Sequence, residues 1–234
     1  MIASLPMYAP PSAPGANAAL WDAMRAAYSG EAPETLTDKR GLWGQWEHPE
    51  VLFSQTCGLP FRTRLKGKVH LVASPDYGLP DCPPGYYNST IVTRQGEKPS
   101  AGMALAFNSA GSQSGWATAH GMGFRPATET GSHAASMAAI SHCQADVALV
   151  DSHTLALHGL PEGLAAHGTT ESTPAPPFIT AFPERAEPLR MALRAAIAHA
   201  PEAAAAIGLK GVVEIDAAAY LAVPNPPAPM MAEF

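Results

Sequence analysis

The sequence is poor in charge, in cysteine and in long apolar runs. Only 15% of its 234 residues are charged, and 14 Lys and Arg residues face 20 Asp and Glu residues, so the net charge is −6 with histidine neutral. Because no basic run is present, we expect no nucleic-acid partner. No stretch approaches the ~18 apolar residues that a membrane-spanning helix needs, so we expect no membrane span.

The first residues, Met1–Tyr8, lack the basic start and the long apolar middle of a secretion signal. We therefore expect the mature form of an exported protein, a form with a misassigned start, or a cytosolic protein.

Three cysteines are present, Cys57, Cys82 and Cys143. Cys57 and Cys82 lie beside Gly or Pro in loop-like sequence, and their two interpretations are a disulfide or two ordinary thiols. Cys143 lies in a helical pattern and is expected to be a small core residue. No Cys/His spacing resembles a zinc site, so we expect no metal, and nothing in the sequence indicates a cofactor.

What the sequence does contain is apolar residues, 47% of the chain, in segments that alternate between strand and helix patterns. This alternation predicts an α/β fold with loops at the strand ends. The predicted strands are 2–7, 51–55, 69–73, 86–93, 104–108, 146–152 and 174–181. The predicted helices are 18–28, 42–46, one from about 116, one from about 133, and 189–200. The tail from Pro224 is Pro-rich and is expected to be irregular.

Three polar segments follow predicted strands or open predicted helices: Ser109–Gly115, Gly131–His133 and Asp151–Ser152. Ligands of open α/β sheets sit beyond the carboxyl ends of the strands. The N–H groups at a helix start also favour negative charge. The pattern predicts an anion site that needs no Lys or Arg.

Two interpretations of the individual side chains stay open. The hydroxyls of Ser112, Ser114 and Ser132 would donate to an anion, with His133 beside them and Gly115 letting the backbone come close. Alternatively, serine before a helix is an ordinary cap that contributes ~1 kcal/mol, and Asp151 caps the turn that follows its strand.

The sequence resembles the substrate-binding components of phosphate/phosphite/phosphonate ABC importers. The resembling segments, in the order of that family, are Ser54–Pro60, Tyr86–Val92, Asn108 with Ser112–Trp116, Thr130–His133 and Ala145–Ser152. The resemblance implies a type 2 periplasmic-binding fold, with two α/β lobes and a ligand cleft between them. The expected lobes are 1–87 with 183–234, and 88–182, joined by two crossing strands.

In that family the serine-rich loop and the Gly-Ser-His helix start hold the phosphonate oxygens. The resemblance therefore assigns ligand contacts to Ser112, Ser114, Gly115, Ser132 and His133. Asp151 resembles the acidic residue at the end of the following strand. Tyr8 and Tyr87 resemble aromatic residues of the cleft. Trp116 stands where the family commonly has tyrosine, so the ligand is expected to differ in detail.

The expected function is that of the solute-binding component of an ABC importer, located in the periplasm and docking on a permease. Its ligand is expected to be a small phosphonate-like or phosphate-like anion, and no catalysis is expected. One alternative is a cytosolic ligand sensor, which the missing secretion signal favours. A second is a thiol enzyme on the same fold, in which Cys57 and a histidine form the nucleophile pair.

Overall fold

A computed structural model describes residues 1–37 and 39–231, and the chain forms two compact units. Unit 1 comprises residues 1–86 and 174–223, and unit 2 comprises residues 87–173 and the tail from Pro224. The chain passes between the units at three points. The first lies in the short strand β4 (Tyr86–Tyr87), the second lies in the short strand β10 (Thr173–Pro174), and the third precedes Pro224. These units differ from the predicted lobes in three places: Tyr87 and the tail belong to unit 2, and residues 174–182 belong to unit 1.

Unit 1 is built on a five-stranded mixed sheet with the order β1-β2-β11-β3-β12. Its strands are β1 (Ile2–Ala3), β2 (Val51–Gln55), β3 (His70–Asp76), β11 (Phe178–Thr180) and β12 (Gly211–Val213). β1 is parallel to β2, and β11 is antiparallel to both β2 and β3. β1, β2 and β3 therefore point the same way, and their carboxyl ends lie at one edge of the sheet.

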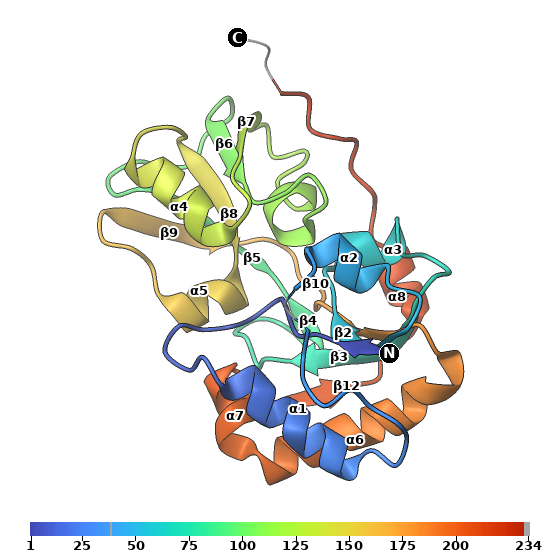
Figure 1. Cartoon of the computed structure of the whole chain (residues 1–234). Helices are drawn as coiled ribbons and strands as arrows, with labels where there is room; N and C mark the ends of the chain where they lie inside the picture. Colours follow the sequence, from blue (N-terminus) through green and yellow to red (C-terminus); the bar gives the residue numbers. More distant parts are fainter. Residues whose placement is uncertain (38, 232–234) are drawn as a thin grey trace. The chain divides into compact units, whose positions relative to one another are not determined.

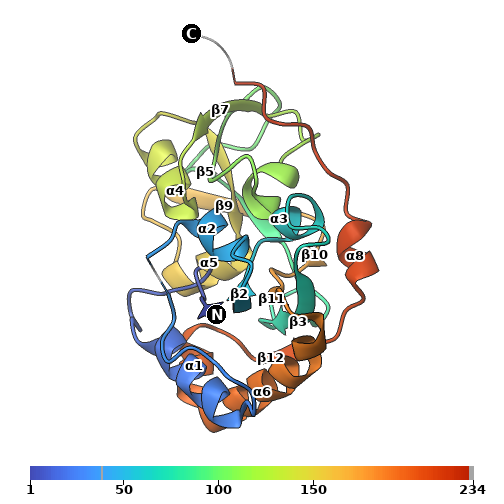
Figure 2. The same ribbon diagram turned by 45° about the vertical axis from the view of Figure 1, so that its right-hand side comes forward.

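Helices cover the sheet of unit 1. α1 (Ala16–Ala27) lies against α6 (Ala186–His199) and α7 (Pro201–Ala206), and α6 packs on β3 and β12; Figure 2 shows α1 and α6 side by side. The 3-10 turn η2 (Pro183–Arg185) leads into α6. Three short helices, α2 (Leu42–Trp46), α3 (Gly58–Arg62) and α8 (Ala217–Leu221), supply Trp46, Phe61 and Tyr220 to a buried cluster.

Unit 2 is built on a second five-stranded sheet with the order β7-β6-β8-β5-β9 (Figure 1). Its strands are β5 (Ser89–Arg94), β6 (Ala104–Phe107), β7 (Arg125–Glu129), β8 (Val147–Asp151) and β9 (Leu164–Thr169). β6 is parallel to both β7 and β8, whereas β5 is antiparallel to β8 and β9.

Alternating side chains of β8 point to opposite faces of this sheet, as in any strand. Ala148 and Val150 pack with the helix α4 (His133–Ser141), whereas Val147 and Leu149 pack with Trp116 of the π-helix η1 (Gln113–Ala117). Both faces of β8 are thus buried, which explains its unbroken apolar run. The helix α5 (Ser152–His158) follows β8 directly.

The α/β class predicted from the sequence is confirmed, but four element predictions are wrong. The first strand stops at Ala3, the predicted strand 86–93 is interrupted at Asn88, and the predicted strand 174–181 is interrupted at residues 175–177. The helix expected from Trp116 begins at Gln113, because the Ser112 hydroxyl caps it by accepting the Gly115 N–H.

The cysteine interpretations also need correction. Cys57 and Cys82 are not joined by a disulfide: Cys57 is buried at the start of α3, and Cys82 is a half-buried thiol in the loop after β3. Burial, with the nearby Asp81 carboxylate, raises the pKa of the Cys82 thiol. Cys143 is exposed and is no core residue, because α4 ends before it and its backbone adopts φ 57°.

In the part of the chain that the structure describes, no helix combines the length and the apolar character needed to cross a membrane.

Candidate anion site in unit 2

The topology of unit 2 brings the three predicted polar segments to one edge of its sheet. β6, β7 and β8 are mutually parallel, so their carboxyl ends, Phe107, Glu129 and Asp151, lie at the same edge. β6 leads into the loop before η1, β7 leads into the loop before α4, and β8 leads into α5. Ligand sites of α/β sheets form at edges of this kind.

Two of these segments are in direct contact. The Ser114 Oγ lies 2.9 Å from the His133 Nε2, and it lies 3.4 Å from the Ser112 Oγ. The Ser112 and Ser114 residues are both buried. We refer to Ser112, Ser114, Ser132 and His133 as the cradle.

Two of the three cradle serines, Ser112 and Ser132, cap helices, as the simpler interpretation predicts, and each keeps a donor while doing so. The Ser112 Oγ accepts the Gly115 N–H at 3.0 Å, and the Ser132 Oγ accepts the Ala135 N–H at 3.1 Å. Since these hydroxyls act as acceptors toward the helices, each retains its O–H for another partner. Capping and anion binding are therefore compatible.

Backbone N–H groups complete the cradle. Among residues 1–37 and 39–231, no hydrogen-bond acceptor takes the N–H of Ser114, His133 or Ala134. The first N–H groups of a helix have no partner inside the helix, and they carry its partial positive charge. Two helix starts therefore present unused donors, and the Ser112 and Ser114 hydroxyls at the first of them are buried.

The histidine of the cradle is neutral near pH 7. Burial lowers the pKa of His133 from 6.5 to about 4, and the backbone of Leu149 offsets only part of this shift. A neutral imidazole has one nitrogen that donates and one that accepts. His133 therefore contributes a polar contact to the Ser114 hydroxyl and no positive charge.

This shift predicts a pH-dependent stability. The pKa of His133 is lower in the folded state than in the unfolded state. Its contribution to the free energy of unfolding is therefore fully present above pH 6.5, and it is lost as the pH falls toward 4. It amounts to at most about 3 kcal/mol. Urea unfolding at pH 6.5 and at pH 4 measures this contribution. We expect the free energy of unfolding to fall less between these two pH values in His133→Gln than in wild type. Parallel pH profiles for the two proteins would contradict the burial of this imidazole.

Position 115 has no room for a side chain, so a glycine is required there. The resemblance alone did not explain this requirement. A Cβ at position 115 would overlap the side-chain oxygen of Asn108, and it would lie 3.3 Å from the Asn108 backbone nitrogen. The Asn108 Oδ1 is buried and has no hydrogen-bond partner within the described residues. Sequence reasoning did not select Asn108 as a site residue, although an asparagine directly after a buried strand is a usable signal.

Asp151 caps the helix that follows its strand. Its Oδ1 accepts the N–H groups of His153 at 2.8 Å and Thr154 at 3.1 Å, so it begins α5. Nearby, the Ser89 hydroxyl donates to the Ser114 carbonyl at 2.9 Å, and the Thr118 hydroxyl donates to the same carbonyl at 2.6 Å. Ser89 and Thr118 thus fix the backbone at Ser114, and sequence reasoning missed both.

The two tyrosines that the resemblance assigned to the cleft belong to different units. Tyr8 is a buried residue of unit 1, edge-on to Tyr77 with ring centroids 5.3 Å apart. The Tyr77 hydroxyl accepts the Gln55 Nε2–H at 2.8 Å. Gln55 and Tyr77, at the carboxyl ends of β2 and β3, form a polar cluster that sequence reasoning missed. Tyr87 is buried at the start of unit 2.

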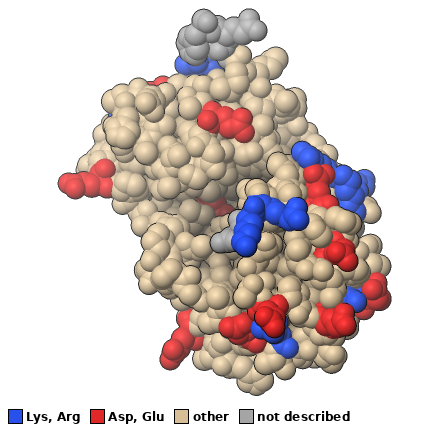
Figure 3. Space-filling model, in the orientation of Figure 1, with Lys and Arg blue, Asp and Glu red and all other residues tan. Residues whose placement is uncertain are grey.

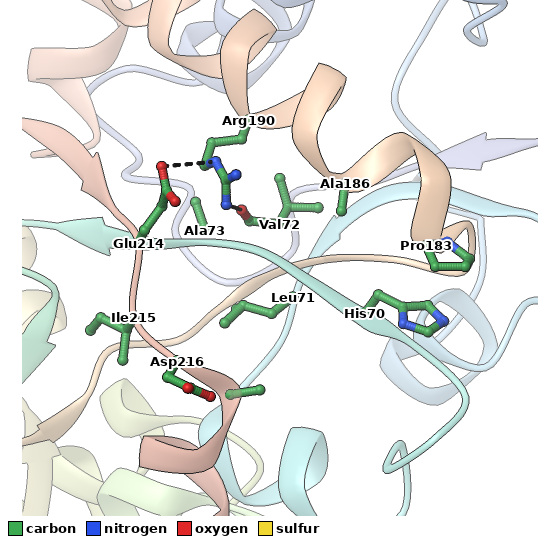
Figure 4. A pocket seen from close by; sticks show the side chains of 11 residues that line it. His70, Leu71, Val72, Ala73, Pro183, Ala186, Arg190, Glu214, Ile215 and Asp216 are labelled. Carbon is green, nitrogen blue, oxygen red and sulfur yellow. Dashed lines mark hydrogen bonds and ion pairs between the residues drawn. The ribbon is translucent and has the colours of Figure 1, made fainter.

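A separate cavity of about 480 Å³ lies in unit 1 beside the start of β3 (Figure 4). Its cation, Arg190, points to the Glu214 carboxylate at 3.3 Å and to the Val72 carbonyl at 3.4 Å. Because Arg190 already pairs with a carboxylate and a carbonyl, the cavity offers an anion fewer unused hydrogen-bond donors than the cradle does.

No protein family description matches the sequence, and no curated protein matches it. The chain is similar in structure to XAC2383 from Xanthomonas citri bound to ATP, at 15% identity over 86% of each chain and a TM-score of 0.60. It is similar to PhnD1 from Prochlorococcus marinus in complex with methylphosphonate, at 13% identity over 73% of this chain and 75% of that one, with a TM-score of 0.57.

A binding protein component of a phosphonate ABC transporter from Pseudomonas aeruginosa is also similar. It is 14% identical over 69% of this chain and 63% of that chain, with a TM-score of 0.52. At these identities the similarity establishes the fold alone, which is that of periplasmic binding proteins, as the resemblance implied.

Proposed function

We propose that this protein is a solute-binding protein whose cradle holds a small oxyanion of the phosphonate or phosphate type. The observation that carries this proposal is the contact between the two helix starts at one edge of the sheet, where the Ser114 Oγ lies 2.9 Å from the His133 Nε2 and both starts keep N–H groups that no described residue accepts. Hydrogen bonds to a charged acceptor are roughly twice as strong as neutral ones. Fixed neutral donors of this kind bind an oxyanion without a cation.

The charge of the chain favours recognition of the anion by local hydrogen-bond donors over attraction by a broad positive field. The chain is acidic, with a net charge of −6. On the face drawn in Figure 3, Lys and Arg side chains are few, and several lie beside Asp or Glu. Within the described residues, no group of three or more His, Cys, Asp or Glu side chains could hold a metal ion. The proposal therefore assigns the anion to hydrogen-bond donors.

The similar solved structures support the proposed ligand class and role. PhnD1 holds methylphosphonate, and the Pseudomonas protein is the binding component of a phosphonate transporter. By analogy, we propose a periplasmic location, an ABC permease as partner, and no catalytic role for this chain.

Titration calorimetry with a panel of small ligands tests the proposal. We expect methylphosphonate, phosphate and methanesulfonate to bind, because each presents tetrahedrally arranged oxygens to several donors. Acetate, with two oxygens, should bind more weakly, and methylammonium should not bind, because the cradle has no anionic group. Binding of methylammonium with no response to any oxyanion would overturn the proposed function.

A further inference from the structure

The C-terminal tail is held by a specific contact with unit 2. Residues 224–231 contain four prolines, have no helix or strand, and belong to unit 2, whereas the preceding helix α8 belongs to unit 1. The Trp116 Nε1–H donates to the Pro227 carbonyl at 2.9 Å. Figure 1 shows the tail as an extended segment without secondary structure.

Proline-rich chain suits a contact of this kind. Proline fixes the backbone torsion φ and lacks an N–H, so the segment loses little conformational entropy on docking, and its carbonyls are available as acceptors. Tryptophan is a donor-only side chain with a large apolar ring. Aromatic surfaces that bind proline-rich segments use the same complementarity.

Trp116 also belongs to the element that carries the cradle. It follows Gly115 in η1, it is buried, and its ring packs on Phe107 with centroids 5.5 Å apart. The Phe107 carbonyl accepts the Thr130 N–H at 2.9 Å, directly before the loop that ends at Ser132. Trp116 therefore connects the tail to both loops of the cradle.

We propose that the proline-rich tail is an internal ligand of unit 2, docked through Trp116, and that this docking holds η1 in the conformation that the cradle requires. The docking does not depend on the proposed function, whereas the effect on anion affinity rests on it. The tail begins at the third point where the chain passes between the two units, so it is covalently tied to unit 1 through α8.

Two full-length variants test the docking. Trp116→Phe removes the indole N–H and keeps an aromatic ring, and Pro226→Gly combined with Pro227→Gly loosens the tail without touching the core. Pro161→Gly, at an exposed proline before β9, is the matched control. The measurements are amide hydrogen exchange of residues 113–118 and the affinity for methylphosphonate.

We expect faster exchange at residues 113–118 in both test variants, and an affinity about fivefold weaker, the factor that corresponds to one net hydrogen bond. The control should match wild type. Unchanged exchange in the tail variant, or an equal change in the control, would overturn the docking. A change that depends on protein concentration would show that the tail binds a second copy, which also overturns it. If exchange responds but wild type binds no oxyanion, the docking stands and the proposed function fails.

Discussion

Replacing Ser114 by alanine is expected to weaken methylphosphonate binding by about 10- to 100-fold while leaving the fold intact. The Ser114 hydroxyl contacts the His133 Nε2 at 2.9 Å, and it can turn from that nitrogen to a bound anion. A hydrogen bond to a charged group contributes about 1.5–3 kcal/mol, which corresponds to this loss of affinity. Titration calorimetry at one fixed pH measures it.

Ser141→Ala is the matched control, because Ser141 lies at the opposite end of α4 and donates only to the Met137 carbonyl at 3.3 Å. We expect this variant to bind methylphosphonate as wild type does. An affinity that Ser114→Ala leaves unchanged would remove Ser114 from the site. Equal losses in both variants would indicate a general effect on unit 2.

The second large effect is expected at Gly115. Its alanine variant must displace the Asn108 side chain, since the added methyl group would overlap the Asn108 Oδ1 and approach the Asn108 backbone. Overpacking of this kind costs about 1–3 kcal/mol. We expect Gly115→Ala to lower the free energy of unfolding by that amount and to abolish measurable methylphosphonate binding, because η1 carries Ser114.

The double variant Gly115→Ala with Asn108→Ala distinguishes two causes of a loss of stability, the clash with the Asn108 side chain and a change of the backbone conformation at position 115. If the clash with the Asn108 side chain causes the loss, the double variant regains most of the stability in urea unfolding. Gly15→Ala is the control, since a Cβ there meets no atom within 4 Å and the backbone φ of −94° suits any residue. A fully stable Gly115→Ala protein would contradict the described contact.

The parts of the fold that the sequence predicts are those with a strong local pattern. The apolar run at 147–150 is buried on both faces of its sheet, and the periodic apolar residues of α6, Leu189, Leu193 and Ala196, are buried as expected. Shorter elements escaped prediction for a physical reason. β9 is mostly half-buried or exposed, so its sequence lacks a sustained alternation of apolar and polar residues. α3 has only five residues, which is too short to show a helical periodicity over two turns.

The candidate site was partly predictable for a related reason. Helix-start serines are visible in the sequence, and the parallel course of β6, β7 and β8 explains why Ser114 and His133 meet. The supporting contacts are long-range and have no local signal. Ser89 reaches the Ser114 carbonyl across 25 positions of the chain, and Trp116 reaches Pro227 across 111. The prediction that Cys143 is a core residue of a helix is wrong because Cys143 itself adopts a left-handed backbone conformation after the end of α4. No local pattern in the sequence indicated this conformation.

The central claim is that an oxyanion sits on the unused donors of two helix starts in unit 2. An amide NMR titration of the full-length protein with methylphosphonate tests it most directly. A hydrogen bond to an anion deshields the donor proton, so we predict that the N–H signals of Ser114, His133 and Ala134 move downfield together and saturate at one dissociation constant. Saturable shifts confined to the surroundings of Arg190 in unit 1, with these three signals unmoved, would contradict the claim.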